Sequence, residues 1–195
     1  TLAAAIVDVT RARRATRVCD PCCGSGTLLI EAALAARGIA PGKNRRFAAM
    51  SWSSILQEIW SQERERALSY ERNSDFSARG GDIDAAVLSL AAQNARKAGV
   101  GDAISFAEAD LRRFKPEGDT GLVLCNPPYG ERLLDVQSAR TLYRVMGQVF
   151  LPKPGWSYAI ISPDEQFEKL FGRPADKRRK LYNGMLKCQL YMYYK

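Results

Sequence analysis

Short apolar runs alternate with stretches of helical periodicity along the chain, which predicts a sheet with helices packed on it. The first pair is a strand at Arg17–Asp20 and a helix at Thr27–Arg37, which Gly38 and Pro41 end. Gly121–Cys125 (GLVLC) is apolar on both faces, as expected of a central parallel strand. The pattern therefore predicts an α/β fold with a parallel sheet.

The same reasoning predicts the remaining elements. A helix over residues 52–70 would place Trp52, Ile55, Leu56, Ile59 and Trp60 on one stripe. Another helix begins after its N-cap Asp84, repeats apolar residues at Val87, Leu90, Ala91 and Ala95, and stops at Gly99. Further helices are expected at residues 141–150 and 165–171, and further strands at residues 76–82, 103–108, 156–162, 180–182 and 186–194.

These elements predict a doubly wound, Rossmann-like sheet of about seven strands with the last strand antiparallel, because Asn183-Gly184 is a hairpin turn signal. We expect residues 1–195 to form one domain, with residues 1–16 as a lead-in helix. The cofactor and the substrate should meet beyond the carboxyl ends of the first and fourth strands.

Composition limits the chemistry. The 195 residues are 46% hydrophobic and 26% charged, typical of one globular domain, and no apolar run approaches the roughly 20 residues that span a bilayer. The chain contains no histidine, which removes every mechanism that needs a histidine base. Cys19 and Cys22 form a C-x-x-C, so zinc or redox chemistry must be considered, but buried thiols explain the five cysteines better. We therefore expect no metal and a reducing, cytoplasmic setting.

The net charge of +8 favours a polyanionic partner. The basic residues gather in three runs, each of which could also be an ordinary solvated surface. Three such runs with few local acids favour RNA. The runs are Arg11, Arg13, Arg14 and Arg17; Arg37, Lys43, Arg45 and Arg46; and Arg173, Lys177, Arg178, Arg179 and Lys180.

A glycine-containing loop, residues 20–27, joins the first strand to the next helix. Gly24 and Gly26 allow a tight turn and close approach of a ligand, but the third glycine of a dinucleotide loop is replaced by Leu29. The loop therefore suits a nucleoside without phosphates, with Asp20 available for its ammonium group, although a G-x-G alone can also be a simple turn. The other candidate residues of this loop are Cys22, Ser25 and Thr27.

Two later strand ends carry further carboxylates. Asp82, followed by Ile83, can accept hydrogen bonds from two ribose hydroxyls, whereas Asp84 is better explained as an N-cap. Asp110 could accept a bond from an adenine amino group, or could be a surface turn residue.

The most specific pattern is Asn126-Pro127-Pro128-Tyr129, directly after the buried strand. Two prolines fix the backbone and remove two N–H donors. The Asn126 side-chain carbonyl and the Pro127 backbone carbonyl could accept the two hydrogens of a planar base amine, and Tyr129 offers a face for stacking an extruded base. A random turn of this composition is improbable after a central strand.

Together these residues resemble class I methyltransferases with an N/D-P-P-Y motif. More narrowly, DPCCGSGTLLIEAALAARGIAPG, NPPYGERL and KRRKLYNGMLKCQLYMY resemble the bacterial THUMP-containing large-subunit ribosomal RNA guanine-N2 methyltransferases. The resemblance implies S-adenosylmethionine as cofactor, held by Asp20, Gly24 and Gly26, with Asp82 on its ribose and Asp110 on its adenine, and catalysis by residues 126–129. The family's THUMP domain precedes the catalytic domain and has no counterpart in this sequence, so we expect its RNA binding to be incomplete.

Three alternatives remain open. DNA adenine-N6 and protein glutamine methyltransferases use the same N-P-P-Y residues. The basic runs argue against a glutamine enzyme, and the resemblance of the carboxyl-terminal segment argues against both. A catalytically silent cofactor-binding or RNA-binding module is the alternative of another class, although such a module has no need of both the glycine loop and an intact N-P-P-Y.

Overall fold

A computed structural model describes residues 1–129 and 135–195. Its described strands form one sheet in the order β3-β2-β1-β4-β5-β7-β6. Only β7 runs against its neighbours, since it pairs antiparallel with both β5 and β6. The predicted doubly wound sheet with an antiparallel strand near its end is confirmed. The strands are β1 (Arg17–Asp20), β2 (Ser77–Asp82), β3 (Ile104–Glu108), β4 (Gly121–Cys125), β5 (Trp156–Ser162), β6 (Lys177–Asn183) and β7 (Leu186–Tyr193).

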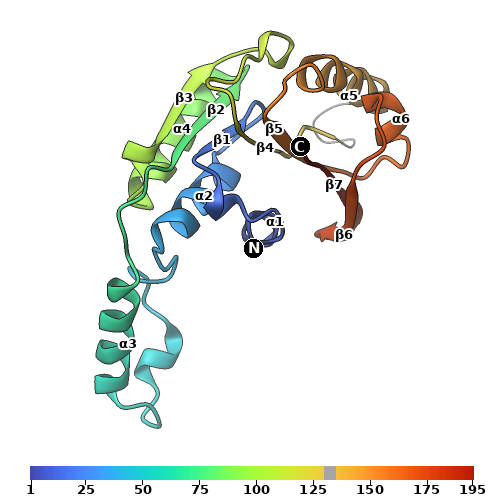
Figure 1. Ribbon diagram of the computed structural model, residues 1–195. Coiled ribbons are helices and arrows are strands. Elements are labelled where there is room, and N and C mark those ends of the chain that lie inside the picture. Colours follow the sequence, from blue (N-terminus) through green and yellow to red (C-terminus); the bar gives the residue numbers. More distant parts are fainter. Residues whose placement is uncertain (130–134) are drawn as a thin grey trace.

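Helices cover both faces of the sheet (Figure 1). One buried cluster joins α1, α2 and α4 to one face, and a second joins α5 and α6 to the other. β4 lies between these clusters, because Leu122 and Leu124 belong to the first and Val123 and Cys125 to the second. The helices are α1 (Leu2–Val9), α2 (Thr27–Arg37), α3 (Gln57–Ser69), α4 (Ala85–Lys97), α5 (Val136–Phe150) and α6 (Phe167–Phe171).

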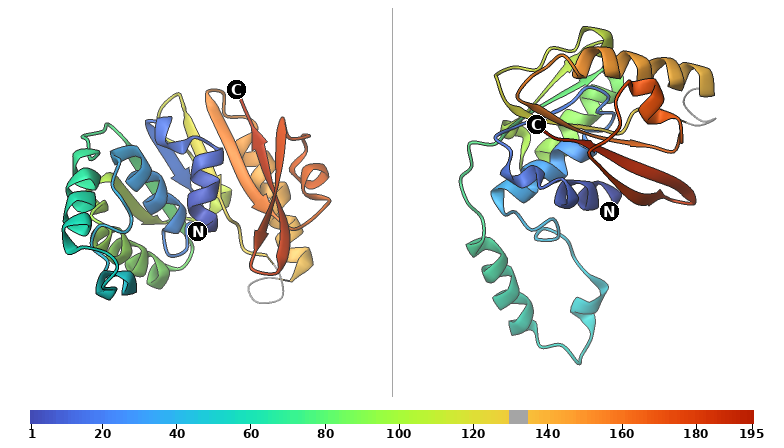
Figure 2. Two further views of the ribbon diagram at one scale, coloured as in Figure 1. Left: turned by 90° about the horizontal axis from the view of Figure 1, so that it is seen from below. Right: turned by 45° about the vertical axis from the view of Figure 1, so that its right-hand side comes forward.

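Residues 39–75 leave the sheet and form an arm that contains α3 (Figures 1 and 2). The helix predicted over residues 52–70 begins only at Gln57, because Leu56 is its N-cap and adopts an extended conformation with ψ 138°. No residue of α3 is buried, and Leu56 is 64% exposed. The apolar stripe seen in the sequence is therefore not a stripe buried against the sheet.

Other predicted helices also differ from the structure in detail. The lead-in helix predicted over residues 1–16 ends at Val9, and α6 begins at Phe167 rather than at residue 165. α5 begins at Val136 rather than at residue 141, because the Asp135 carboxylate caps it by accepting from the backbone of Gln137 and Ser138. In α4, Leu90 belongs to the predicted apolar repeat but is exposed, whereas Leu88, outside that repeat, is buried.

Candidate active site

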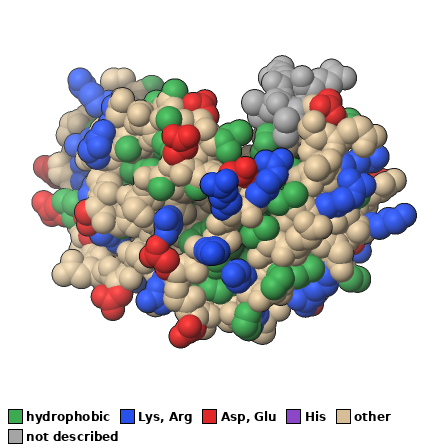
Figure 3. All heavy atoms as spheres, turned by 90° about the horizontal axis from the view of Figure 1, so that it is seen from above, with side chains coloured by type: hydrophobic (Ala, Val, Ile, Leu, Met, Phe, Trp, Pro, Cys, Tyr) green, Lys and Arg blue, Asp and Glu red, His purple; other side chains and the backbone are tan. Residues whose placement is uncertain are grey.

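A cavity of about 900 Å³ opens beyond the carboxyl ends of β1, β2 and β4. It lies where the strand order reverses between β1 and β4, the point at which open α/β sheets bind ligands. On the face shown in Figure 3, Lys and Arg side chains gather along the middle of the molecule, beside a hollow with exposed hydrophobic side chains. Of the predicted site residues, the cavity is lined by Asp20, Cys22, Gly24, Ser25, Thr27, Asp82, Ile83, Asp110, Asn126 and Pro128.

The two glycines of the loop have different surroundings. Both have positive φ, +51° at Gly24 and +80° at Gly26, a backbone conformation that residues with a Cβ rarely adopt. A Cβ at Gly24 would meet nothing within 4 Å, so the backbone there is open to a ligand. A Cβ at Gly26 would lie 3.1 Å from Phe106 and 3.2 Å from Ala91. Gly26 therefore permits close packing of the loop on β3 and α4 and does not itself line the cavity.

Asp20 ends β1 and is only 2% exposed. Burial raises the pKa of its carboxyl to about 7, although the backbone N–H of Cys22 donates to it at 3.0 Å. A carboxylate in this position lacks water to stabilise its charge, so a cationic group of a ligand would be strongly favoured beside it.

Asp82 lies at the end of β2, next to the loop. Its Oδ2 accepts from the backbone N–H of Gly24 at 3.0 Å, and its Oδ1 accepts from the backbone N–H of Asp84 at 3.1 Å. The neighbouring Ile83 is 74% exposed and offers an apolar surface to the cavity. Asp84 caps α4 through Ala86, as predicted, and also lines the cavity.

Asp110 is a turn residue, one of its two sequence-based interpretations, and its contact with an adenine amino group stays a prediction. Its carboxylate caps a short helical turn by accepting from the backbone N–H of Arg112 at 2.8 Å, and it also pairs with the Arg112 guanidinium at 3.0 Å. These bonds, led by the one from the backbone, lower the pKa of Asp110. The residue also lines the cavity, so its remaining lone pairs can reach a ligand.

The residues of the N-P-P-Y motif separate into two environments. Asn126 is exposed and lines the cavity with Pro128, while Pro127 is buried behind them. Tyr129 is half-buried against the cluster under α1 and α2, and its hydroxyl accepts from Asn183 Nδ2 at 3.0 Å. Burial raises the pKa of Tyr129 to about 12, so its hydroxyl stays protonated. The residues that follow in the resembling segment, 130–134, lie outside the described part of the chain.

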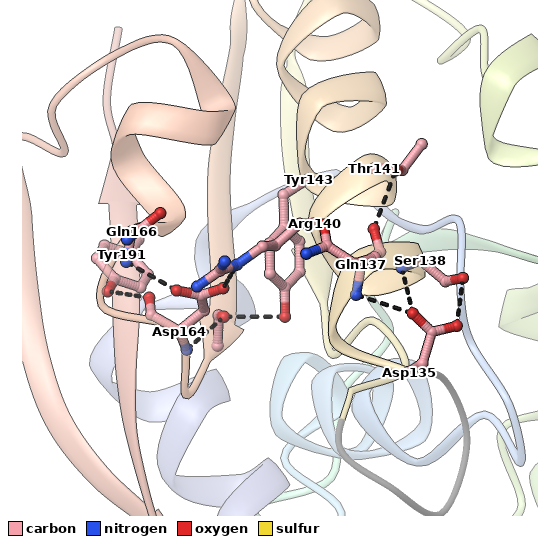
Figure 4. Close-up of polar contacts among 10 residues, drawn as sticks. Asp135, Gln137, Ser138, Arg140, Thr141, Tyr143, Asp164, Gln166 and Tyr191 are labelled. Carbon is pink, nitrogen blue, oxygen red and sulfur yellow. Dashed lines mark hydrogen bonds and ion pairs between the residues drawn. The ribbon is translucent and has the colours of Figure 1, made fainter.

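The sequence did not predict that the first turns of α5 form a wall of the cavity. Gln137, Ser138 and Thr141 line it, and Figure 4 shows how this helix is fixed. The Arg140 guanidinium pairs with Asp164 at 2.8 Å, and Ser162 donates to the Tyr143 hydroxyl at 3.0 Å. The N-cap Asp135 was the available signal, since Asp, Ser and Thr favour helix starts.

Comparison with known proteins agrees with this geometry. Residues 1–192 match the family model described as the RMKL-like methyltransferase domain. The chain belongs to this family. Its sheet is accordingly that of a class I methyltransferase.

Two relatives of this methyltransferase domain carry names that describe RNA methyltransferases. YpsC of Bacillus subtilis (strain 168) is 40% identical over 197 residues, covering 100% of this chain and 51% of that protein. The ribosomal RNA large subunit methyltransferase K/L of Legionella pneumophila (strain Lens) is 40% identical over 174 residues, covering 88% of this chain and 25% of that protein. The chain thus spans about half of the length of the first relative and a quarter of the length of the second.

Two solved structures are similar over nearly the whole domain. SMU.472, described as a methyltransferase and complexed with SAH, superposes with a TM-score of 0.93 at 40% identity, covering 99% of this chain and 52% of that chain. A protein of Listeria monocytogenes str. 4b F2365, described as an N6-adenine-specific DNA methylase, superposes with a TM-score of 0.90 at 41% identity, covering 99% of this chain and 50% of that chain.

Four of the five thiols of this methyltransferase domain have little access to solvent. Cys19, Cys23, Cys125 and Cys188 are buried, and burial raises the pKa of Cys19 to about 12 and also raises the pKa of Cys23 and Cys125. Within residues 1–129 and 135–195, no three His, Cys, Asp or Glu side chains gather as a metal site would require. None of the described helices is long and apolar enough to cross a bilayer.

Proposed function

We propose that this chain is the catalytic domain of an S-adenosylmethionine-dependent RNA methyltransferase that modifies an exocyclic base amine, with guanine N2 of large-subunit ribosomal RNA as its target. Residues 1–195 would work as one domain, with residues 1–16 as its lead-in. The observation that carries the proposal is that Asn126 lines the same cavity as Asp20 and Asp82. One ligand in that cavity would therefore lie beside the residue that holds the amine.

The cavity suits S-adenosylmethionine, or its product SAH, in several chemical respects. Asp20 is a buried carboxylate whose charge a cation, such as the ligand's ammonium group, would stabilise. Gly24 leaves space for close backbone approach, and Asp82 has lone pairs for the ribose hydroxyls. The exposed side chain of Ile83 fits a flat purine face, with Asp110 available for the adenine amino group.

The residues of the N-P-P-Y motif would position the base amine. S-adenosylmethionine, when bound, would supply a methyl group whose bond to sulfur breaks as an amine nitrogen attacks it, so that SAH is the leaving group. Asn126 and the Pro127 carbonyl would each accept one N–H of the base amine, which turns the nitrogen lone pair toward that methyl group. Holding reactants in line can lower the barrier by several kcal/mol. Neither acceptor is a strong base, so the surplus proton leaves to solvent as the new N–C bond forms or just after.

RNA as substrate is supported by the net charge of +8 and by the names of the two relatives. DNA adenine N6 is a second candidate, favoured by the description of the Listeria monocytogenes structure. Both targets are planar exocyclic amines, so the two acceptors at residues 126 and 127 would serve either.

A parallel transfer assay separates these functions. The protein would be incubated with S-adenosylmethionine labelled in its methyl group and with unmodified ribosomal RNA, unmethylated DNA or a glutamine-containing peptide. The proposal expects label in RNA alone. Label in DNA or peptide would favour the corresponding alternative, and SAH binding without transfer to any of the three would favour a silent binding module.

A further inference from the structure

The turn between β6 and β7 projects from the edge of the sheet at which the cavity opens. Gln189 of β7 lies opposite Ser162, the last residue of β5, so the start of β7 extends beyond the carboxyl ends of the parallel strands. Gly184, with φ +62°, and Met185 form the turn between the two strands. The hairpin is the outermost part of the sheet, on the side away from β3 (Figure 2).

This hairpin contacts the catalytic motif directly. Asn183, the last residue of β6, donates from Nδ2 to the Tyr129 hydroxyl at 3.0 Å. The Cys188 thiol of β7 approaches the same hydroxyl at 3.9 Å, and Leu181 packs on the same buried cluster as the Tyr129 ring. The turn is therefore held beside the N-P-P-Y residues by both strands.

The side chains that the turn presents to solvent are apolar and basic. Met185 is 99% exposed, Tyr182 55% and Leu186 43%. The Lys180 ammonium lies 5.2 Å from the centroid of the Tyr182 ring, and Lys187 is exposed. No acidic residue occurs in the sequence after Asp176. A chain segment with apolar side chains, several cations and no acidic residue complements a nucleic acid, whose base faces are apolar and whose backbone is anionic.

We propose that this turn, residues 182–187, contacts the nucleotides that flank the target base, with Met185 packed against base faces. The inference rests on the proposed function. A base whose amine reaches Asn126 must leave its stack, and its neighbours then expose their faces. Apolar side chains inserted at such steps compensate for the lost stacking. Lys180 and Lys187 would neutralise the adjoining phosphates.

Site-specific photocrosslinking tests this contact without relying on activity. Met185→p-benzoylphenylalanine would be irradiated with unmodified large-subunit ribosomal RNA in the presence of SAH. The control is the same substitution at Leu68, which is 53% exposed on α3, on the other side of the molecule (Figure 1). We expect a much stronger crosslink to RNA from position 185 than from position 68, which lies on the arm that also carries Lys43, Arg45 and Arg46. No crosslink from position 185, or equal crosslinking from both, would overturn the inference.

Methyl transfer by Met185→Ala gives an independent result. On folded ribosomal RNA its kcat/KM should fall about tenfold, because no apolar side chain then replaces the stacking that the target base loses. On short unstructured fragments of the same RNA, the fall should be less than about twofold, since little stacking has to be broken. Equal falls on both substrates, or none, would contradict the role of Met185. The wild type in the same reactions separates the two proposals, because its failure to methylate any RNA would count against the proposed function itself.

Discussion

The backbone N–H of Gly24 donates a hydrogen bond of 3.0 Å to Oδ2 of Asp82, a residue 58 positions later in the chain. This bond joins the glycine loop after β1 to the end of β2. Asp82 Oδ1 is oriented as well, by the backbone N–H of Asp84. The carboxylate is therefore fixed before any ligand arrives, which lowers the entropic cost of binding.

Asp82→Ala should weaken SAH binding by roughly 1.5–3 kcal/mol, the usual worth of a hydrogen bond to a charged group. Asp82→Asn is the matched variant, because its side-chain carbonyl can still accept from Gly24 while its charge is lost. We expect an intermediate loss for Asp82→Asn by calorimetric titration. Unchanged affinity in both variants would exclude Asp82 from the ribose site.

SAH affinity should depend on pH through Asp20. Its pKa is raised to about 7, chiefly by burial, and the ligand's ammonium group favours the carboxylate form. Affinity should therefore rise with pH by up to about tenfold per pH unit below that value and level off above it. The same titration on Asp20→Asn should show weaker binding and a flat profile. A wild-type profile that is flat between about pH 5 and pH 8 would contradict this role.

The same carboxyl should make the folded protein less stable as the pH rises. The pKa of this acid is higher in the folded state than in the unfolded chain, where it is about 3.9, so its ionisation destabilises the fold. The loss of stability grows as the pH rises between the two pKa values and is complete above the higher one. In the absence of ligand, Asp20→Asn should therefore raise Tm at about pH 8 and leave it nearly unchanged at about pH 4. A lower Tm for Asp20→Asn than for the wild type at the higher pH would contradict this prediction. It would mean that the folded protein stabilises the Asp20 carboxylate.

The two loop glycines should respond differently to alanine. Both substitutions incur the left-handed backbone cost of about 1–2 kcal/mol. Gly26→Ala should lose more stability than Gly24→Ala, because its Cβ would press on Phe106 and Ala91. Gly24→Ala should instead lose more SAH affinity, since its Cβ enters the open cavity. Thermal melts and calorimetry on both variants check this, and the reverse order would contradict the assigned roles.

Much of the sheet could be predicted because its strands carry local signals. β1, β4 and β5 have the predicted bounds, since each contains apolar residues between polar or turn-forming ones. α3 was predicted too long because an apolar stripe at helical spacing does not reveal that Leu56 is extended. Nor does the stripe reveal whether any surface covers it. The start of α5 was predicted at residue 141, five residues after its true start. The prediction therefore missed that Gln137, Ser138 and Thr141 line the cavity.

The residues that line the cavity could be predicted only where a local sequence pattern marks them. Asp20 and Asp82 end their strands and Asn126 follows one, and parallel strands bring their carboxyl ends to one edge. The bond from Asn183 to Tyr129 spans 54 positions and depends on how the hairpin folds back. No local pattern encodes such a contact. Whether Tyr129 also stacks on a base stays a prediction.

Asn126→Ala should separate catalysis from cofactor binding. Asn126 would hold the amine chiefly in the transition state, so single-turnover methyl transfer should fall at least about a hundredfold, the scale of one preorganised polar contact. SAH affinity should stay within about twofold of the wild type. Equal losses of rate and affinity would mean that Asn126 supports the structure of the cavity instead.

The identity of the methylated nucleoside tests the central claim most directly. Unmodified large-subunit ribosomal RNA would be incubated with the protein and methyl-labelled S-adenosylmethionine, then digested to nucleosides and separated. We predict that the label is found in N2-methylguanosine, and that Asn126→Ala lowers it at least about a hundredfold. Label in another nucleoside, or no label in the RNA, would contradict the proposed function.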